Sequence, residues 1–292
     1  MFTIFTCPKP FVGQMLDLQL KAIRSWMQVK PAAEILLLGD GLDTCKVAND
    51  FGLRHLPDIE KNALGTPLVN SIFEKAEAAA SFPLICYVNT DILFFGNFSF
   101  ALKAAQKKFK KFLLTGRRYD LDNCDLEISG NWQEELLLRL KARGRIQPYG
   151  SDYFLFPKGT FKRIPPFALG RGAWDNWLVY YLSLHHTAVI DVSGFIYSVH
   201  QAHDYSHILG QNQGKTWKGQ EADYNKSLGG EALYFYAEDI IYRLDSKGIR
   251  INFLSLIFLY LTKLYLAFPF MKRVILKAKR LKLKFCNHLD NI

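Results

Sequence analysis

The sequence has no Cys-x-x-Cys pair, no internal repeat and no basic segment at its N-terminus. Its five cysteines are scattered and odd in number, which argues against a disulfide framework and for reduced thiols in a cytosol. The opening residues, MFTIFTCPKPF, hold only a short apolar run before Pro8, so we expect no cleavable secretion signal. These absences predict a protein that stays in the cytoplasm.

Acidic residues are almost absent from the C-terminal segment. Residues 247–292 hold ten Lys or Arg and a single acid, Asp290, whereas residues 1–246 hold 27 basic and 26 acidic residues. The tail therefore carries +9 of the net charge of +10, and we divide the chain into a domain at 1–246 and a tail at 247–292. A body this close to neutral predicts no nucleic-acid partner.

Apolar runs alternate with amphipathic stretches through the first half of the chain, and 49% hydrophobic residues are enough for a large core. This order predicts an α/β fold, a mostly parallel sheet with helices on both faces. The expected strands are 2–7, 34–40, 53–56, 83–91, 111–116 and 150–159, and the expected helices are 13–28, 42–52, 66–80, 98–108 and 168–184. Two polar stretches, 118–131 and 209–230, are expected to be loops.

Polar residues follow three of these strands at their carboxyl ends, where ligands of parallel sheets bind. They are Asp40, the Asn89-Thr90-Asp91 triplet, and the pair Arg117 and Arg118. Asp91 is suited to bind Mg²⁺ or Mn²⁺ directly, and Asn89 to offer a carbonyl oxygen or hold a ribose hydroxyl. The alternative is a simple Asx turn after the strand.

Two further carboxylates are candidates for catalysis. Asp152 precedes the strand at 150–159, where it either faces the same cleft or caps the turn. Asp175 lies between Trp174 and Trp177 near the start of an apolar helix. Aromatic walls would desolvate this carboxylate and raise its pKa, which suits a general base, although helix capping explains the same pattern.

The segment VHQAHDYSH holds His200 and His203, with Asp204 beside them. The spacing is similar to that of a zinc site, but a second cluster of acidic or cysteine ligands is missing. We favour a single histidine from this segment, His200 or His203, that completes the coordination of a metal held by Asp91.

The ordered motifs EILLLGD, GTPLVNSIFEKA, LICYVNTDILFF, GSDYFLFPKG, PPFALGRGAWDNWL and VHQAHDYSH resemble those of bacterial and plant nucleotide-diphospho-sugar transferase-like proteins of the GT-A fold. The resemblance covers roughly residues 1–245. It implies that Asp91 and Asn89 occupy the last and first positions of a DxD metal-binding motif, in which Asn89 is a departure.

By the same resemblance, Thr6, Pro8 and Asp40 would surround the nucleoside of the donor. Asp175 would be the carboxylate that activates the acceptor, and His200 or His203 the late metal-binding histidine. Arg117 or Arg118 would help to neutralise the leaving diphosphate.

The tail combines an apolar stretch at 251–271 with a basic amphipathic stretch at 272–285. Asn252, Ser255, Thr262 and Lys263 gather on one narrow face of a helical wheel, which favours a helix lying in a membrane interface over one that crosses. The basic residues suit an anionic lipid surface. A helix packed on the domain and a single membrane-spanning helix are the alternatives.

The sequence therefore predicts a glycosyltransferase held peripherally at the cytoplasmic face of the cell membrane, with a nucleotide-sugar donor and a glycan or lipid-linked acceptor. Mn²⁺ or Mg²⁺ is the expected cofactor. The alternatives are a metal-dependent hydrolase that uses His200, His203 and Asp204, and a non-enzymatic scaffold.

Overall fold

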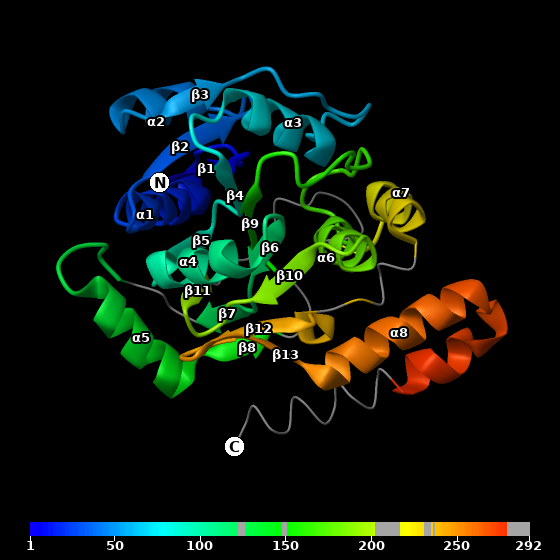
Figure 1. Cartoon of the computed structure of the whole chain (residues 1–292). Helices are drawn as coiled ribbons and strands as arrows, with labels where there is room; N and C mark the ends of the chain where they lie inside the picture. The colour runs from blue at the N-terminus through cyan, green and yellow to red at the C-terminus, as the bar shows by residue number, and fades with distance from the viewer. Residues whose placement is uncertain (122–125, 148–150, 202–216, 231–234, 236, 279–292) are drawn as a thin grey trace.

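The chain forms a mixed α/β structure with two sheets, seen in a computed structural model that describes residues 1–121, 126–147, 151–201, 217–230, 235 and 237–278. The large sheet has the strand order β13-β12-β10-β6-β9-β4-β1-β2-β3, and the small sheet has the order β5-β11-β7-β8. Helices flank the large sheet (Figure 1).

The strands of the large sheet are mostly parallel, as the sequence predicts, with five parallel and three antiparallel pairings. The strand β9 runs against its neighbours β4 and β6 and therefore begins at the edge where they end. The strands are β1 (Phe2–Thr6), β2 (Ala33–Leu38), β3 (Arg54–Leu56), β4 (Leu84–Val88), β6 (Phe112–Thr115), β9 (Tyr153–Pro157), β10 (Ala188–Asp191), β12 (Tyr242–Asp245) and β13 (Gly248–Ile251).

Helices cover both faces of the large sheet, because its strands are apolar on both sides and need cover on each. In β4, Cys86 packs on one face with α1, α2 and α4, whereas Ile85 and Tyr87 pack on the other with α3 and α6. The bounds of these helices are α1 (Gly13–Met27), α2 (Thr44–Asp50), α3 (Val69–Ala79), α4 (Phe98–Lys108) and α6 (Trp174–Leu184).

Three strands of the large sheet continue directly into the small sheet. β4 leads into β5 through residues 89–91, β6 into β7 through 116–117, and β10 into β11 through 192–195. One face of the small sheet packs on α5 and forms a separate hydrophobic core, which includes Trp132 and Leu136 of α5. Its elements are β5 (Ile92–Gly96), β7 (Arg118–Leu121), β8 (Arg145–Gln147), β11 (Ile196–Gln201) and α5 (Trp132–Arg143).

The expected loops are wrong in two places. Residues 118–121 of the first polar stretch form β7, since their backbone pairs with β11 and β8. In the second stretch, α7 (Gln220–Gly229) is a helix that packs near α6, held by Asn225, whose side chain bonds the backbone of Ala168. Residues 209–216 lie outside the described residues.

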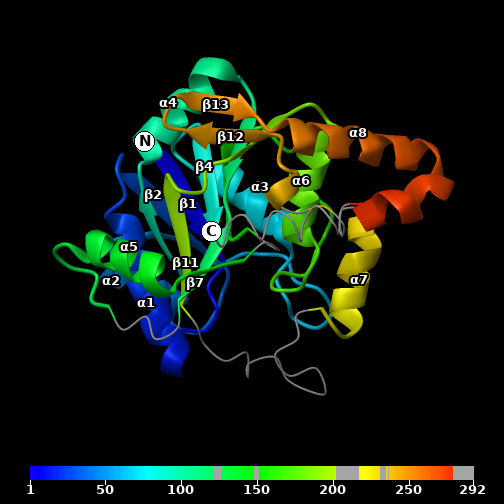
Figure 2. The same ribbon diagram turned by 90° about the horizontal axis from the view of Figure 1, so that it is seen from below.

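The start of the expected tail is part of the large sheet. The antiparallel hairpin of β12 and β13 spans the predicted boundary at 246/247. Next come the 15-residue helix α8 (Phe253–Ala267) and the short 3-10 helix η3 (Pro269–Met271). Figure 2 shows α8 extending outward past α6. Within the part of the chain that the structure describes, no helix has the length and apolar character needed to cross a membrane.

Glu34 on β2 fastens the N-terminal strands to the turn before β4. Its carboxylate accepts hydrogen bonds from the Thr3 hydroxyl, at 2.6 Å, and from the Ser81 backbone N–H, at 2.8 Å, and it pairs with Arg54. Burial alone would raise its pKa, but these hydrogen bonds overcome that effect and lower the pKa to about 2.

We expect Glu34→Gln to lower the free energy of unfolding by about 1–2 kcal/mol at neutral pH. A carboxyl with a lowered folded pKa stabilises the protein above its unfolded pKa and loses this effect as the pH falls towards the folded value. The deficit of the variant should therefore shrink below about pH 4.5. Urea unfolding across this range measures it, with the exposed Glu74→Gln as the control. A pH-independent deficit would contradict this account.

Candidate active site

The candidate site lies where the three strands leave the large sheet. The loop after β4 carries Asn89 and Asp91, the crossing from β6 to β7 carries Arg117 and Arg118, and Asp152 immediately precedes β9. Because β9 runs in the opposite direction, its first residues meet the carboxyl ends of β4 and β6. The convergence expected from the sequence is therefore present for these residues, and it includes Asp152.

Asn89 and Asp152 clamp the loop to the start of β9. The Asn89 backbone N–H donates to the Asp152 carbonyl at 3.0 Å, and its side-chain amide donates to Asp152 Oδ1 at 2.7 Å. The Tyr87 hydroxyl donates to Asn89 Oδ1 at 2.8 Å. Both the oxygen and the nitrogen of the Asn89 side-chain amide are therefore hydrogen-bonded, so this side chain orients the loop.

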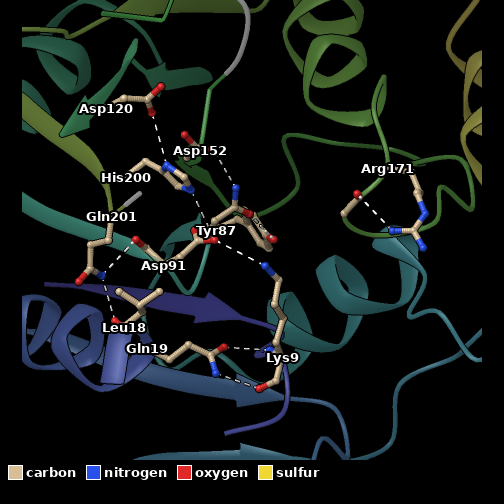
Figure 3. A network of polar contacts seen from close by, with 12 residues as sticks. Lys9, Leu18, Gln19, Tyr87, Asp91, Asp120, Asp152, Arg171, His200 and Gln201 are labelled. Atoms are coloured by element: carbon tan, nitrogen blue, oxygen red, sulfur yellow. Dashed lines mark hydrogen bonds and ion pairs between the residues drawn. The ribbon is translucent and has the colours of Figure 1, made fainter. Parts of the chain in front are cut away.

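His200 lies between two carboxylates at the end of β11 (Figure 3). Its Nδ1 is 3.4 Å from Asp120 Oδ1, and its Nε2 is 3.9 Å from Asp91 Oδ2. The Lys9 ammonium is 3.7 Å from the same Asp91 oxygen. The Gln201 side chain donates to the Asp91 carbonyl at 3.2 Å and fixes the backbone there.

This geometry fits a hard divalent cation. A metal-binding histidine commonly donates its second ring N–H to a carboxylate, and Asp120 is placed to accept it from His200. Two ligands at about 2.1 Å from an octahedral ion are about 3.0 Å apart in cis and about 4.2 Å in trans. The 3.9 Å between Asp91 and His200 lies between these two values, so a small rotation of either side chain would bring both onto one ion.

The described residues would supply only a small part of the ligands of such a metal ion. Among the residues that the structure describes, no group of three or more His, Cys, Asp or Glu could hold a metal ion. Mg²⁺ and Mn²⁺ accept one or two protein ligands and take phosphate and water oxygens for the rest. His203, with Asp204, lies outside the described residues.

Arg118 forms ion pairs with two carboxylates of the site, Asp120 and Asp152. Its Nε is 2.9 Å from Asp120 Oδ1 and 3.7 Å from Asp152 Oδ2. Burial raises the pKa of Asp152 and outweighs the attraction of Arg118. Burial also acts to raise the pKa of Asp120, but the hydrogen bond from His200 and the Arg118 charge hold it below its usual value. Arg117 is buried, and its backbone N–H donates to the Ser193 hydroxyl at 2.8 Å.

Asp175 faces the same region from the first turn of α6. Burial between aromatic side chains raises its pKa to about 6, and the nearby negative charge of Asp152 adds to the rise. The aromatic flanks predict this direction from sequence alone. The preceding Ala173 has a φ of 88°, a conformation that non-glycine residues rarely adopt, so the entry to this helix is strained.

The residues expected around a nucleoside lie on the neighbouring strands. Thr6 ends β1 and is buried, as is Pro8, whereas Asp40 follows β2 and is exposed. Asp40 pairs with Lys61, whose hydrogen bond lowers the pKa of Asp40, and it lines a shallow pocket of about 670 Å³. Since β1 separates β2 from β4, Asp40 lies about 10 Å across the sheet from the Asp91 loop.

Sequence reasoning missed Asp120, Lys9 and Tyr87. Asp120 belongs to a stretch expected to be a loop, and only its pairing opposite His200 in β7 and β11 brings the two together. The signal in the sequence is weak: Asp120 follows Arg118 by two residues, a spacing that puts both on one face of a strand. No local pattern distinguishes Lys9 from other surface lysines.

Comparisons with known proteins give matches among solved structures but none in sequence. No protein-family model matches the chain, and no curated protein sequence does. Among solved structures, S. aureus TarS 1-349 in complex with UDP-GlcNAc aligns at a TM-score of 0.45 and 12% identity, over 80% of this chain and 71% of that one. The structure titled S. aureus TarS 1-349 aligns at 0.31 and 12% identity, over 44% and 38%. The alignment thus spans less than half of that second chain, and similarity at this level carries no argument about activity.

We expect Asp175→Asn to stabilise the protein at high pH. A carboxyl whose folded pKa lies above its unfolded value binds its proton more tightly in the folded state, so its ionised form destabilises the fold above about pH 6. The variant should gain about 1–2 kcal/mol in the free energy of unfolding at about pH 8 and nothing at about pH 4.

Thermal or urea unfolding at the two pH values measures this difference. Asp223→Asn, at a carboxylate that is 70% exposed on α7, is the matched control and should show no such pH dependence. Equal stability of Asp175→Asn and the unmodified protein at high pH would show that the carboxylate is well solvated.

Proposed function

We propose that the protein is a metal-dependent glycosyltransferase of GT-A architecture that transfers a sugar from a nucleoside-diphosphate sugar. One observation carries the proposal: Asp91, on the loop after β4, and His200, on β11, lie 3.9 Å apart, with Asp120 on the other side of the imidazole. The motif order described above supports the same reading.

The donor would lie across the ends of β2, β1 and β4. Its nucleoside would fill the region between Asp40 and the end of β1, and its diphosphate would reach Asp91. A cation on Asp91 and His200 would supply charge neutralisation of the leaving diphosphate. Lys9, whose ammonium is 3.7 Å from Asp91, would turn to the phosphates and add a second positive charge.

Asp175 would act as the general base. With a pKa of about 6 it is ionised near neutral pH, yet basic enough to take the proton of an acceptor hydroxyl as that oxygen attacks the anomeric carbon. A single carboxylate base at Asp175 would favour inversion of the anomeric centre. Asp152 would orient Asn89 and Arg118 rather than contact the sugar, because it accepts a hydrogen bond from Asn89 and forms an ion pair with Arg118 at 3.7 Å. A glycan or a lipid-linked sugar would supply the hydroxyl.

We expect a donor to raise the melting temperature only when Mn²⁺ or Mg²⁺ is present, because both Asp91 and the diphosphate would bind the cation. At about 100 times Kd, one-site binding adds about 2.7 kcal/mol to the free energy of unfolding. The measurement is a thermal-shift series of the full chain with UDP-, GDP-, CMP- and dTDP-sugars, UDP-GlcNAc among them, with and without metal.

Asp91→Asn should abolish the metal-dependent shift, whereas Asp223→Asn should leave it intact. Stabilisation by zinc without any nucleotide sugar would favour the hydrolase instead. No shift with any donor in well-folded protein would contradict the proposal and favour the scaffold.

Asp120→Asn tests the orienting carboxylate separately. Loss of such a partner typically weakens metal affinity about 10- to 100-fold, because the imidazole is no longer fixed in the tautomer that presents Nε2. Titration of Mn²⁺ followed by the electron spin resonance of the free ion measures the affinity. An unchanged affinity for Mn²⁺ would place the ion away from His200.

A further inference from the structure

The outer side of α8 is a large apolar surface. Of the nineteen large apolar side chains that are exposed in the described structure, ten lie between residues 251 and 274. We call them the α8 apolar face: Ile251, Phe253, Leu254, Ile257, Tyr260, Leu264, Leu266, Phe268, Phe270 and Val274. Phe253 is 72% exposed and Phe270 is 81% exposed, so these side chains are not covered by the domain.

Helix α8 is amphipathic in the reverse of the usual sense for a surface helix: its small polar residues face the domain, and apolar residues are exposed. Its small polar residues, Ser255 and Thr262, are buried against the domain. The Ser255 hydroxyl donates to the Glu238 carbonyl at 2.7 Å, and the Thr262 hydroxyl donates to the Phe258 carbonyl at 2.9 Å. Two residues of the narrow polar face seen on the helical wheel, Ser255 and Thr262, therefore point towards the domain. A helix that satisfies its polar groups inside and presents its apolar groups outside is built for an apolar neighbour.

The segment that carries the α8 apolar face is basic in sequence. Residues 247–278 include six Lys or Arg and neither Asp nor Glu, and Arg250 pairs with Asp245 of the preceding strand. Arg273 and Lys277, which follow η3, are exposed, and Val274 between them is 70% exposed. Apolar side chains beside these exposed cations match the boundary of an anionic lipid layer, where acyl chains lie beneath negative headgroups.

We propose that the α8 apolar face docks the protein on an anionic membrane surface, with α8 lying in the interface. A span of the hydrocarbon core needs about 20 residues, and α8 has 15, with its inner side occupied by the domain. A second copy of the chain fits less well, because a symmetric pairing of this surface would bring like charges together. Docking of this face on lipid does not require the proposed glycosyl transfer.

Docking on this face would also orient the candidate active site. α8 contacts α6, the helix that carries Asp175 in its first turn, and Leu259 of α8 shares a core with Leu178 and Leu182 of α6. A rigid connection of this kind would hold the strand ends at a constant height above the lipid.

Flotation of the full chain with vesicles tests the proposal. We expect the unmodified protein to float with phosphatidylcholine vesicles that contain about 30% phosphatidylglycerol, and to float less with phosphatidylcholine alone. Ile257→Gln combined with Phe270→Gln should reduce flotation by at least about fivefold. The double substitution removes apolar area that would be buried in the membrane, and it leaves the net charge unchanged. Arg273→Gln combined with Lys277→Gln should reduce binding to the anionic vesicles only.

Leu64→Gln combined with Leu138→Gln is the matched control, since these side chains are 64% and 67% exposed on other surfaces. All variants change exposed residues, so an unchanged melting temperature verifies that each one folds. Equal flotation of the Ile257/Phe270 variant and the unmodified protein would overturn the proposal. So would a dimer that does not float and that the same two substitutions convert to a monomer. Donor binding by thermal shift is unaffected in either case, which separates this result from the test of the glycosyltransferase.

Discussion

The structure depends on one constraint: three strands, β4, β6 and β10, leave the large sheet at the same edge and enter the small one. A backbone that changes sheets loses its ladder partners, and buried N–H and C=O groups must find others. Side chains supply them here. The Ser193 hydroxyl accepts a hydrogen bond from the Arg117 backbone N–H. Asn89 donates hydrogen bonds to both the backbone carbonyl and the carboxylate of Asp152. The polar residues needed to make this junction are also the ones that form the candidate site.

Carboxylates gather at the junction in the described part of the chain. Asp91, Asp120 and Asp152 lie there with Arg118 and Lys9 close to their oxygens. Under the proposed function, Lys9 would turn towards a phosphate and a divalent cation would take its place beside Asp91 and the buried imidazole of His200. Because burial makes uncompensated charge costly, the cation and the diphosphate would then compensate each other and bind together.

The large sheet could be predicted from the sequence because its strands are buried on both faces and appear as continuous apolar runs. The small sheet could not, since its strands are short, and β5 reads as an extension of β4 in LICYVNTDILFF. Asp91 and Asp175 stand out through local context, whereas Asp120 acquires meaning only from its pairing opposite His200. For α8, the helical wheel shows the polar stripe correctly. Which side faces inward depends on the Glu238 carbonyl, a partner that the wheel does not contain.

Two features of the chain cost stability without benefiting the fold, and they lie on helices that touch. The carboxylate of Asp175 is held where burial opposes its charge, and the α8 apolar face is left in contact with water. Substitutions that remove such costs are easily reached, so a protein that needed only to fold would have little reason to keep either feature. Both costs disappear in a defined environment: the carboxylate when it receives a proton, the apolar face when it meets lipid. Because α6 and α8 share one core, docking of the α8 apolar face on lipid would also determine which molecules can approach Asp175.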